Sequence, residues 1–324
     1  MTLRLQSCSS FCFHSDLIKH IHFNSNKGDK MKKIFLLLLF ASGISFADIK
    51  VVASTTVIYD LVKEIGGSKV DVDYIARGDQ DPHFVEVLPR YMLKLRNARI
   101  FFRIGMALEL WSNQLIDGSR NNNLKVIDLS QEIDKKEVPN FKPDASYGDV
   151  HPYGNPHYWL DPDNGRRIAK GIANKLAQLD PENAAYFQQR FQDFDKRLTA
   201  AEQKWDAEMR PYAGRKVVSY HNSWPNFAHH FHLNVVGYVE PRPGIPPTPG
   251  HTLDLIKEMR SGNVKIIMVE PYFDLKTPNS IARETGGKVL VMCPSVGGEK
   301  GVTDYFKLFD YDIQKLVDAF KSLP

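Results

Sequence analysis

Hydrophobic residues between positions 184 and 209 recur at steps of three and four, which is the spacing of one face of an α-helix. These apolar positions are Ala184, Phe187, Phe191, Phe194, Leu198, Ala201, Trp205 and Met209. Asp180 and Pro181 supply a capping residue and a first-turn proline, and Pro211 ends the pattern. A helix over 181–210 would be about 45 Å long, because each residue adds about 1.5 Å. We therefore predict one long helix that joins two lobes.

On both sides of this helix, short apolar runs typical of buried strands alternate with amphipathic runs typical of helices. The strand-like runs before it are the first part of 49–67 and the runs 69–76, 98–105 and 124–130, and those after it are 214–220, 234–240, 264–270 and 288–294. This alternation is typical of parallel sheets. The pattern predicts an α/β fold with two lobes, 48–180 and 211–324. Each lobe is expected to contain a mainly parallel sheet flanked by helices.

The first 47 residues are predicted to be removed from the mature protein. From Met31 the sequence MKKIFLLLLFASGISFA has two lysines, an apolar run too short to span a bilayer, and small residues at Ser45 and Ala47. This is the pattern of a cleavable secretory signal. The residues before it are predicted to be an upstream extension, so translation starts at Met1 or Met31. Because no cysteine stands at the cleavage site to take a lipid anchor, we expect a soluble periplasmic protein.

The charge of the mature chain argues against a nucleic-acid partner. The whole chain has 42 basic and 38 acidic residues, but the first 47 residues contain six of the basic and two of the acidic ones. The remaining 277 residues are therefore balanced at 36 of each sign. We expect neither nucleic acid nor an anionic membrane surface as a partner. Cys293 is the one cysteine left, so no intramolecular disulfide is expected.

Three of the eight remaining histidines occupy similar places in the predicted topology. His83 follows the end of one strand, His157 lies in the loop before the connecting helices, and His221 follows another strand. Ligands bind at the carboxyl ends of strands in open α/β sheets, so these side chains are expected to face one crevice. Each histidine alone is most simply an ordinary loop residue. Together they predict a metal site, because three imidazoles and one further ligand complete a zinc shell.

Several motifs strengthen this prediction through a resemblance to a known family. They are DPHFVEVLP, NPHYWLDPDN, SYHNSWPNFAHHF and VEPYFDLKTPNSIARETGGKVLV, with GMALELW after the third strand. The chain resembles the metal-binding substrate-binding proteins of ABC importers, the zinc and manganese receptors with a rigid helix between their lobes. The resemblance implies that His83, His157 and His221 bind a metal ion. It also implies delivery of that ion to a membrane permease.

The fourth ligand is where this sequence departs from the family pattern. The family often has an aspartate just after the final strand, whereas Cys293 stands near that place here. Glu270 ends another strand and would point into the same crevice, although it could instead orient a loop. Cys293 could supply a thiolate, or it could be a small buried hydrophobic residue, and water is a further alternative. We predict Glu270, because an exported free thiol is exposed to oxidation.

The remaining histidines and two tryptophans receive simpler interpretations. The loop before the second motif is short and holds His151 together with Asp144 and Asp149. His229, His230 and His232 are expected on a solvated helix face, and His251 at the start of a helix. Trp159 and Trp224 flank ligand loops and are expected to orient them.

These observations predict a monomeric receptor that binds a divalent metal between its lobes and is not an enzyme. Three histidines favour zinc, with manganese as the alternative, since manganese sites of this kind use more carboxylate. Release is expected on contact with the permease or on protonation of the imidazoles below about pH 6.

A zinc hydrolase with Glu270 as its base is an alternative, but the chain lacks an HExxH helix. An adhesin that uses the metal only structurally is a third reading.

Overall fold

Parallel strands build the sheet of the first lobe. The computed structural model describes residues 49–141, 151–242 and 244–323, which belong to the unit spanning Asp48–Pro324. The first sheet has the strand order β2-β1-β3-β4, and each neighbouring pair is parallel. Its strands are β1 (Ile49–Thr55), β2 (Val70–Ala76), β3 (Ile100–Arg103) and β4 (Lys125–Asp128). The predicted signal at 31–47 and the extension before it lie outside the described residues.

The sheet of the second lobe repeats this arrangement, with the order β6-β5-β7-β8 and parallel pairing. Its strands are β5 (Lys216–Ser219), β6 (Asn234–Tyr238), β7 (Ile266–Val269) and β8 (Lys288–Val291). The helices of the first lobe are α2 (Thr56–Gly66), α3 (Pro89–Asn97), α4 (Ser112–Ser119) and α5 (Pro162–Leu179). Those that follow the long helix are α7 (Pro225–His230), α8 (Pro249–Ser261), α9 (Lys276–Thr285) and α10 (Tyr305–Lys321). The predicted α/β class with two parallel sheets is confirmed.

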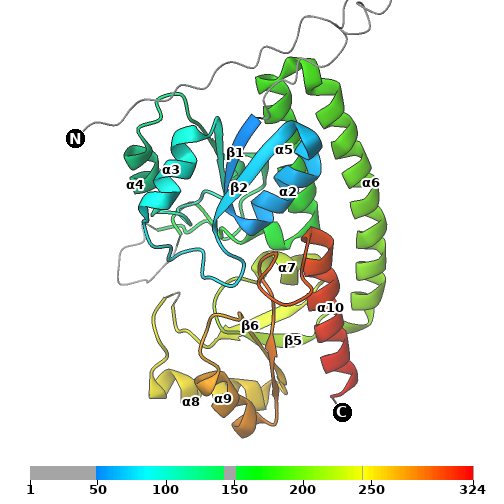
Figure 1. Ribbon diagram of the computed structural model, residues 1–324. Coiled ribbons are helices and arrows are strands. Elements are labelled where there is room, and N and C mark those ends of the chain that lie inside the picture. Colours follow the sequence, from blue (N-terminus) through cyan, green and yellow to red (C-terminus); the bar gives the residue numbers. More distant parts are fainter. Residues whose placement is uncertain (1–48, 142–150, 243, 324) are drawn as a thin grey trace, which may run out of the picture. The chain divides into compact units, whose positions relative to one another are not determined.

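The long helix predicted between the lobes is α6 (Ala184–Met209), which runs beside elements of both lobes in Figure 1. A 3-10 turn precedes it at Pro181–Asn183, where the Asp180 side chain accepts the backbone N–H of Asn183, and another follows at Arg210–Tyr212. Its buried side chains are Phe187, Phe194, Leu198, Trp205 and Met209. This apolar face packs on α2 and α5 of the first lobe and on α10. The helix therefore shares one hydrophobic core with both lobes.

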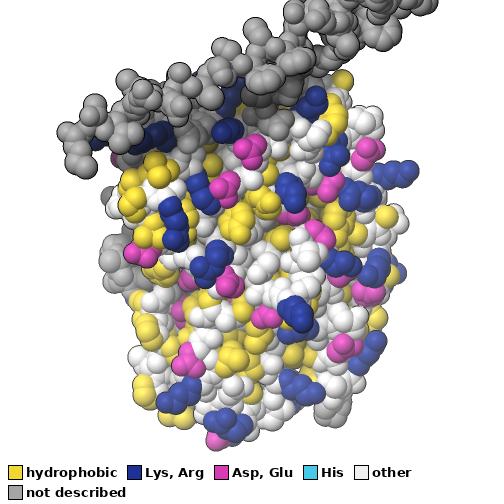
Figure 2. Space-filling model, in the orientation of Figure 1, with side chains coloured by type: hydrophobic (Ala, Val, Ile, Leu, Met, Phe, Trp, Pro, Cys, Tyr) yellow, Lys and Arg dark blue, Asp and Glu magenta, His cyan; other side chains and the backbone are white. Residues whose placement is uncertain are grey.

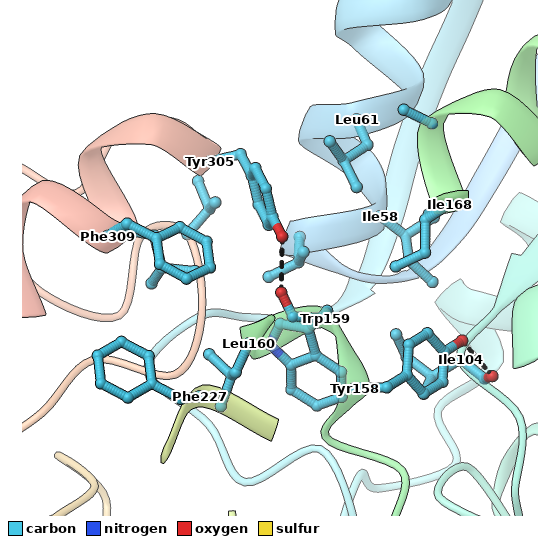
Figure 3. Packing of buried hydrophobic residues seen from close by; sticks show 14 of the residues in the cluster. Ile58, Leu61, Ile104, Tyr158, Trp159, Leu160, Ile168, Phe227, Tyr305 and Phe309 are labelled. Atoms are coloured by element: carbon cyan, nitrogen blue, oxygen red, sulfur yellow. Dashed lines mark hydrogen bonds between the residues drawn. The ribbon is translucent and has the colours of Figure 1, made fainter. Parts of the chain in front are cut away.

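Direct contacts also join loops of the two lobes. In Figure 3 the Tyr305 hydroxyl points to the backbone oxygen of Trp159, to which it donates a hydrogen bond of 2.7 Å. The Trp159 indole N–H in turn donates to the carbonyl oxygen of Pro294 at 2.7 Å. A Cβ at Gly78 would lie 2.1 Å from the carbonyl oxygen of Val296, so only glycine fits there. The loops after β2 and β8 are thus in contact.

The surface carries both signs of charge. On the face drawn in Figure 2, basic and acidic side chains are interspersed and form no large area of a single sign. Among the described residues, none of the helices combines the length and the apolar character needed to cross a bilayer.

A buried carboxyl group connects α2 to the start of α10. Asp60 Oδ2 accepts the backbone N–H of Tyr305 at 2.8 Å. Burial raises the pKa of Asp60 to about 6, with a contribution from the charges of Asp304 and Glu64, although the hydrogen bond from Tyr305 acts in the opposite direction. The folded protein therefore holds a proton on Asp60 at pH values where the unfolded chain has lost it.

We expect Asp60→Asn to flatten the pH dependence of stability between about pH 4 and pH 6. Because the folded-state pKa lies above the unfolded value, this group makes the protein less stable as pH rises through that window. Its contribution is about 2 to 3 kcal/mol across the window. Asparagine keeps the acceptor for Tyr305 but does not titrate. Denaturant unfolding at several pH values measures the effect, and the exposed Asp71→Asn serves as control. If the free energy of unfolding of Asp60→Asn depended on pH as it does in the unchanged protein, the raised pKa of Asp60 would be contradicted.

Candidate metal centre

Three imidazole side chains from distant parts of the sequence converge at one point. The ligand nitrogens of His83, His157 and His221 all lie within 4.8 Å of one another. Their ring centroids are 5.1 to 5.4 Å apart. His83 lies in the loop after β2, His157 directly before the turn that leads into α5, and His221 in the loop after β5. The structure thus brings together the three histidines that the sequence analysis singled out.

Each of these rings is oriented by an oxygen acceptor on its Nδ1 side. The pairs are His83 with the Asp81 carboxylate at 2.7 Å, His157 with the Asn155 amide oxygen at 3.2 Å, and His221 with the Glu240 carboxylate at 2.8 Å. An acceptor next to Nδ1 assigns the ring proton to that nitrogen, which leaves the Nε2 lone pair available. This is the arrangement in which proteins present histidine to a metal ion.

His157 is the most enclosed of the three histidines. Its side chain is 1% exposed, and its Nε2 atom is buried without a hydrogen-bond partner among the described residues. Burial lowers the pKa of His157 well below its usual value, and the neighbouring His83 and His221 add to this effect. The ring is therefore neutral at physiological pH, with a lone pair that lacks a protein partner. A buried polar atom left in this way favours a bound cation.

His221 has the opposite electrostatic surroundings. Burial alone would lower the pKa of His221, but the hydrogen bond to Glu240 and the charges of Glu270, Glu240 and Asp81 outweigh burial and raise it. Carboxylates therefore favour positive charge on this side of the site, whether a proton or a metal ion supplies it.

The structure does not place Glu270 within the close group of ligand atoms. Glu270 lies directly after β7, is fully buried, and accepts a hydrogen bond from the Trp224 indole at 3.0 Å. Its second oxygen has no hydrogen-bond partner in the described part of the chain. Burial raises the pKa of Glu270 to about 7, whereas the nearby His221 lowers it. Glu270 is thus a neighbour of His221 on one side of the site.

Cys293 is also outside the group and belongs to the hydrophobic core. Its thiol donates to the carbonyl oxygen of Ser295 at 3.1 Å. Burial raises the pKa of Cys293 to about 12, with a smaller contribution from Asp312. Its burial in the core and its absence from the group of close ligand atoms favour the interpretation as a small buried residue.

A fourth histidine, which the sequence analysis treated only as part of a short loop, lies against the site. The Nε2 atom of His151 is 3.2 Å from that of His83, and the two rings stack at a centroid distance of 5.2 Å. Spacing along the chain gave no signal for this contact, since His151 lies neither at a strand end nor in a ligand motif. The carboxylates of Asp81 and Glu240 were also missed, although Glu240 follows a strand end and Asp81 stands two residues before His83.

A second group of ligand atoms forms around His230, which was expected on a solvated helix face. Asp161, Asp163 and His230 place ligand atoms within 4.8 Å of one another. Both ring nitrogens of His230 are paired, Nδ1 with Asp161 at 3.0 Å and Nε2 with Asp206 at 3.4 Å. Burial lowers the pKa of His230, but these carboxylates outweigh it and raise the pKa. His230 is therefore half-buried in an ion-pair network. His229 is exposed on α7 as expected, whereas His232 is exposed but lies after the end of that helix.

Two parallel sheets joined by one long helix, with converging imidazoles on loops of both lobes, define the class of metal-binding substrate-binding proteins of ABC importers. A family model described as the periplasmic zinc-uptake complex component A (ZnuA) matches residues 51–319. The chain belongs to this family.

Known relatives agree with this placement. The chain is 26% identical over 314 residues to the metal ABC transporter substrate-binding lipoprotein SloC of Streptococcus mutans, covering 90% of this chain and 100% of that protein. It is 24% identical over 316 residues to the manganese ABC transporter substrate-binding lipoprotein PsaA of Streptococcus anginosus, with the same coverage. A crystal structure of a zinc-bound ZnuA deletion mutant aligns with a TM-score of 0.74 and 26% identity, covering 86% of this chain and 100% of that one.

We expect Glu240→Gln to weaken metal binding by about 10- to 100-fold, the range seen when an outer-shell partner of a histidine ligand is changed. Glutamine can still accept the Nδ1–H of His221, but without the negative charge the imidazole is a weaker base. Isothermal titration with zinc at a fixed pH measures the loss. Glu258→Gln, on the exposed side of α8, is the matched control. Equal affinities in the two variants would contradict the role given to Glu240.

Proposed function

We propose that this chain captures one zinc ion through His83, His157 and His221 and delivers it to the membrane permease of an ABC importer. The observation that carries this proposal is the convergence of three imidazoles within 4.8 Å, each with its Nδ1 side held by an oxygen acceptor. Three such groups fit the nitrogen-rich tetrahedral shell that zinc favours. The family to which the chain belongs supplies the transport context.

The choice of zinc over manganese rests on the donor atoms. Relatives are named for manganese as well as for metals in general, so kinship alone does not select the ion. Imidazole suits zinc, whereas manganese prefers carboxylate, carbonyl and water oxygens. Here the close group contains three nitrogens, and its carboxylates, Asp81 and Glu240, face the Nδ1 side of the rings. This donor set supports zinc as the cargo.

Glu270 is proposed to support the bound ion through its charge. The carboxylate is near enough to His221 for each to shift the pKa of the other. A divalent ion at the imidazoles would favour the ionised form of a group whose pKa burial raises to about 7. The idea that Glu270 itself is the fourth ligand stays a prediction.

The transport cycle follows from how the lobes are joined. The long helix packs in one hydrophobic core with both lobes, and Gly78 lies close to Val296 of the other lobe. These contacts resist a wide hinge motion. Loading is therefore proposed to move the loops that carry the ligands more than the lobes. The signal pattern at 31–47 supports export to the periplasm, where the protein acts as a monomer, and permease contact or imidazole protonation releases the ion.

Purified, chelator-stripped protein is expected to bind one zinc ion per chain and to prefer zinc when zinc and manganese compete. His157→Ala removes the most enclosed ligand and is expected to abolish stoichiometric binding. Metal analysis after equilibrium dialysis measures both effects.

The matched control is His229→Ala, which removes an exposed histidine outside the close group and is expected to bind zinc like the unchanged protein. Absence of stoichiometric zinc in the unchanged protein would overturn the proposed function. A preference for manganese under competition would overturn the choice of cargo.

A further inference from the structure

His151 presents a nitrogen to His83, one of the three converging histidines, although its ligand atom does not lie within 4.8 Å of all three. Its Nε2 atom lies 3.2 Å from Nε2 of His83, and its ring stacks on that of His83 with an interplanar angle of 28°. Its ring centroid is 6.5 Å from that of His157. His151 is half-buried, although it comes from a loop. Its ligand atom therefore faces the site from the side of His83.

The position of the ring proton on His83 makes this contact informative. The Asp81 carboxylate next to Nδ1 places the ring proton of His83 there, so Nε2 of His83 is a lone pair. This lone pair faces the Nε2 atom of His151 at 3.2 Å. A cation between the two nitrogens could be bound by both rings.

The distance between the two nitrogens matches shared coordination. Zinc binds histidine nitrogens at about 2.0 to 2.1 Å, so two such ligands of one tetrahedral ion are separated by about 3.3 to 3.4 Å. The observed separation of 3.2 Å is close to this value. Of the candidates for the fourth position, His151 alone has a ligand atom at this distance from one of the three histidines among the contacts the structure describes.

The loop that carries His151 is fixed to the rest of the protein at its end. The Asn155 side chain donates to the Glu137 carboxylate at 3.0 Å and to the backbone oxygen of Asn222 at 2.9 Å. The Asn155 backbone N–H donates to the carbonyl oxygen of Lys136 at 2.9 Å. These bonds tie the segment 151–155 to both lobes, because Lys136 and Glu137 precede the long helix and Asn222 follows it. His151 is thus four residues from a fixed anchor, and its own ring contacts His83.

We propose that His151 is the fourth ligand of the bound ion, in place of Glu270. This inference rests on the proposed metal-binding function and specifies its site as four imidazoles from four segments of the chain. Such a shell is neutral and contains only nitrogen donors, which favours zinc and disfavours manganese. His83 and His151 hold the ion from one side, and His157 and His221 from the other. In this arrangement Glu270 does not bind the ion, and its negative charge near His221 stabilises the positive charge of the ion.

X-ray absorption spectroscopy of the zinc-loaded protein tests this directly, because it counts imidazole ligands. We expect four in the unchanged protein, three in His151→Ala and four in Glu270→Gln. The zinc affinity of His151→Ala is expected to fall by at least about 10- to 100-fold, since even outer-shell changes cause such losses. Tyr153→Ala, an exposed residue of the same loop, is the control for disturbing the loop and is expected to retain four ligands.

The outcomes separate this inference from the proposed function. An unchanged ligand count and affinity in His151→Ala would overturn the role of His151 while zinc binding itself stands. Loss of a ligand in Glu270→Gln, with His151→Ala unaffected, would overturn it in favour of Glu270. If the unchanged protein bound no zinc, the proposed function would fall together with the inference.

Discussion

The site depends on where one proton sits on each histidine ring. In a buried space, neighbouring neutral imidazoles can form hydrogen bonds with one another if the proton can occupy either ring nitrogen. The rings would then rotate to make these bonds. The oxygen atoms of Asp81, Asn155 and Glu240 fix the proton on the outer nitrogen of each ring. The inner nitrogens are then all acceptors, and such a set is complementary to a cation and to little else.

The fold serves this constraint by bringing strand ends from two sheets to one place. His83 and His221 follow strands of different lobes. Asp81 lies in the same loop as His83, and Glu240 follows β6, the strand next to β5. Parallel sheets collect the carboxyl ends of their strands at one edge, so ligands and their supports arrive together. Helix α6 and the hydrogen bond from Tyr305 to Trp159 hold the two lobes in contact. The three histidines therefore come together only when both lobes are folded.

Electrostatics divides the site into two halves. Around His157 and His151, burial and neighbouring imidazoles lower the pKa values and disfavour a proton, so these rings are neutral. Around His221, Glu240 and Glu270 favour positive charge despite equal burial. A metal ion satisfies both halves at once, because it supplies the charge that the carboxylates favour and occupies the lone pairs that the buried rings present. Protons would therefore compete with a metal ion most strongly at His221, because the pKa of this ring is raised.

The sequence by itself predicted the alternation of strands and helices, the two parallel sheets, a long helix that the structure has at Ala184–Met209, and three of the converging histidines. These follow from periodicity and from residue type at strand ends, which are local properties of the chain. Only the tertiary structure decided that Glu270 lies outside the close group, that Cys293 is buried in the hydrophobic core, and that His151 lies against His83. Each of these depends on which side chains meet across the lobes and how deeply they are buried. The paths of the loops decide which side chains meet, and the surrounding packing decides how deeply they are buried. Neither property follows a regular pattern along the sequence.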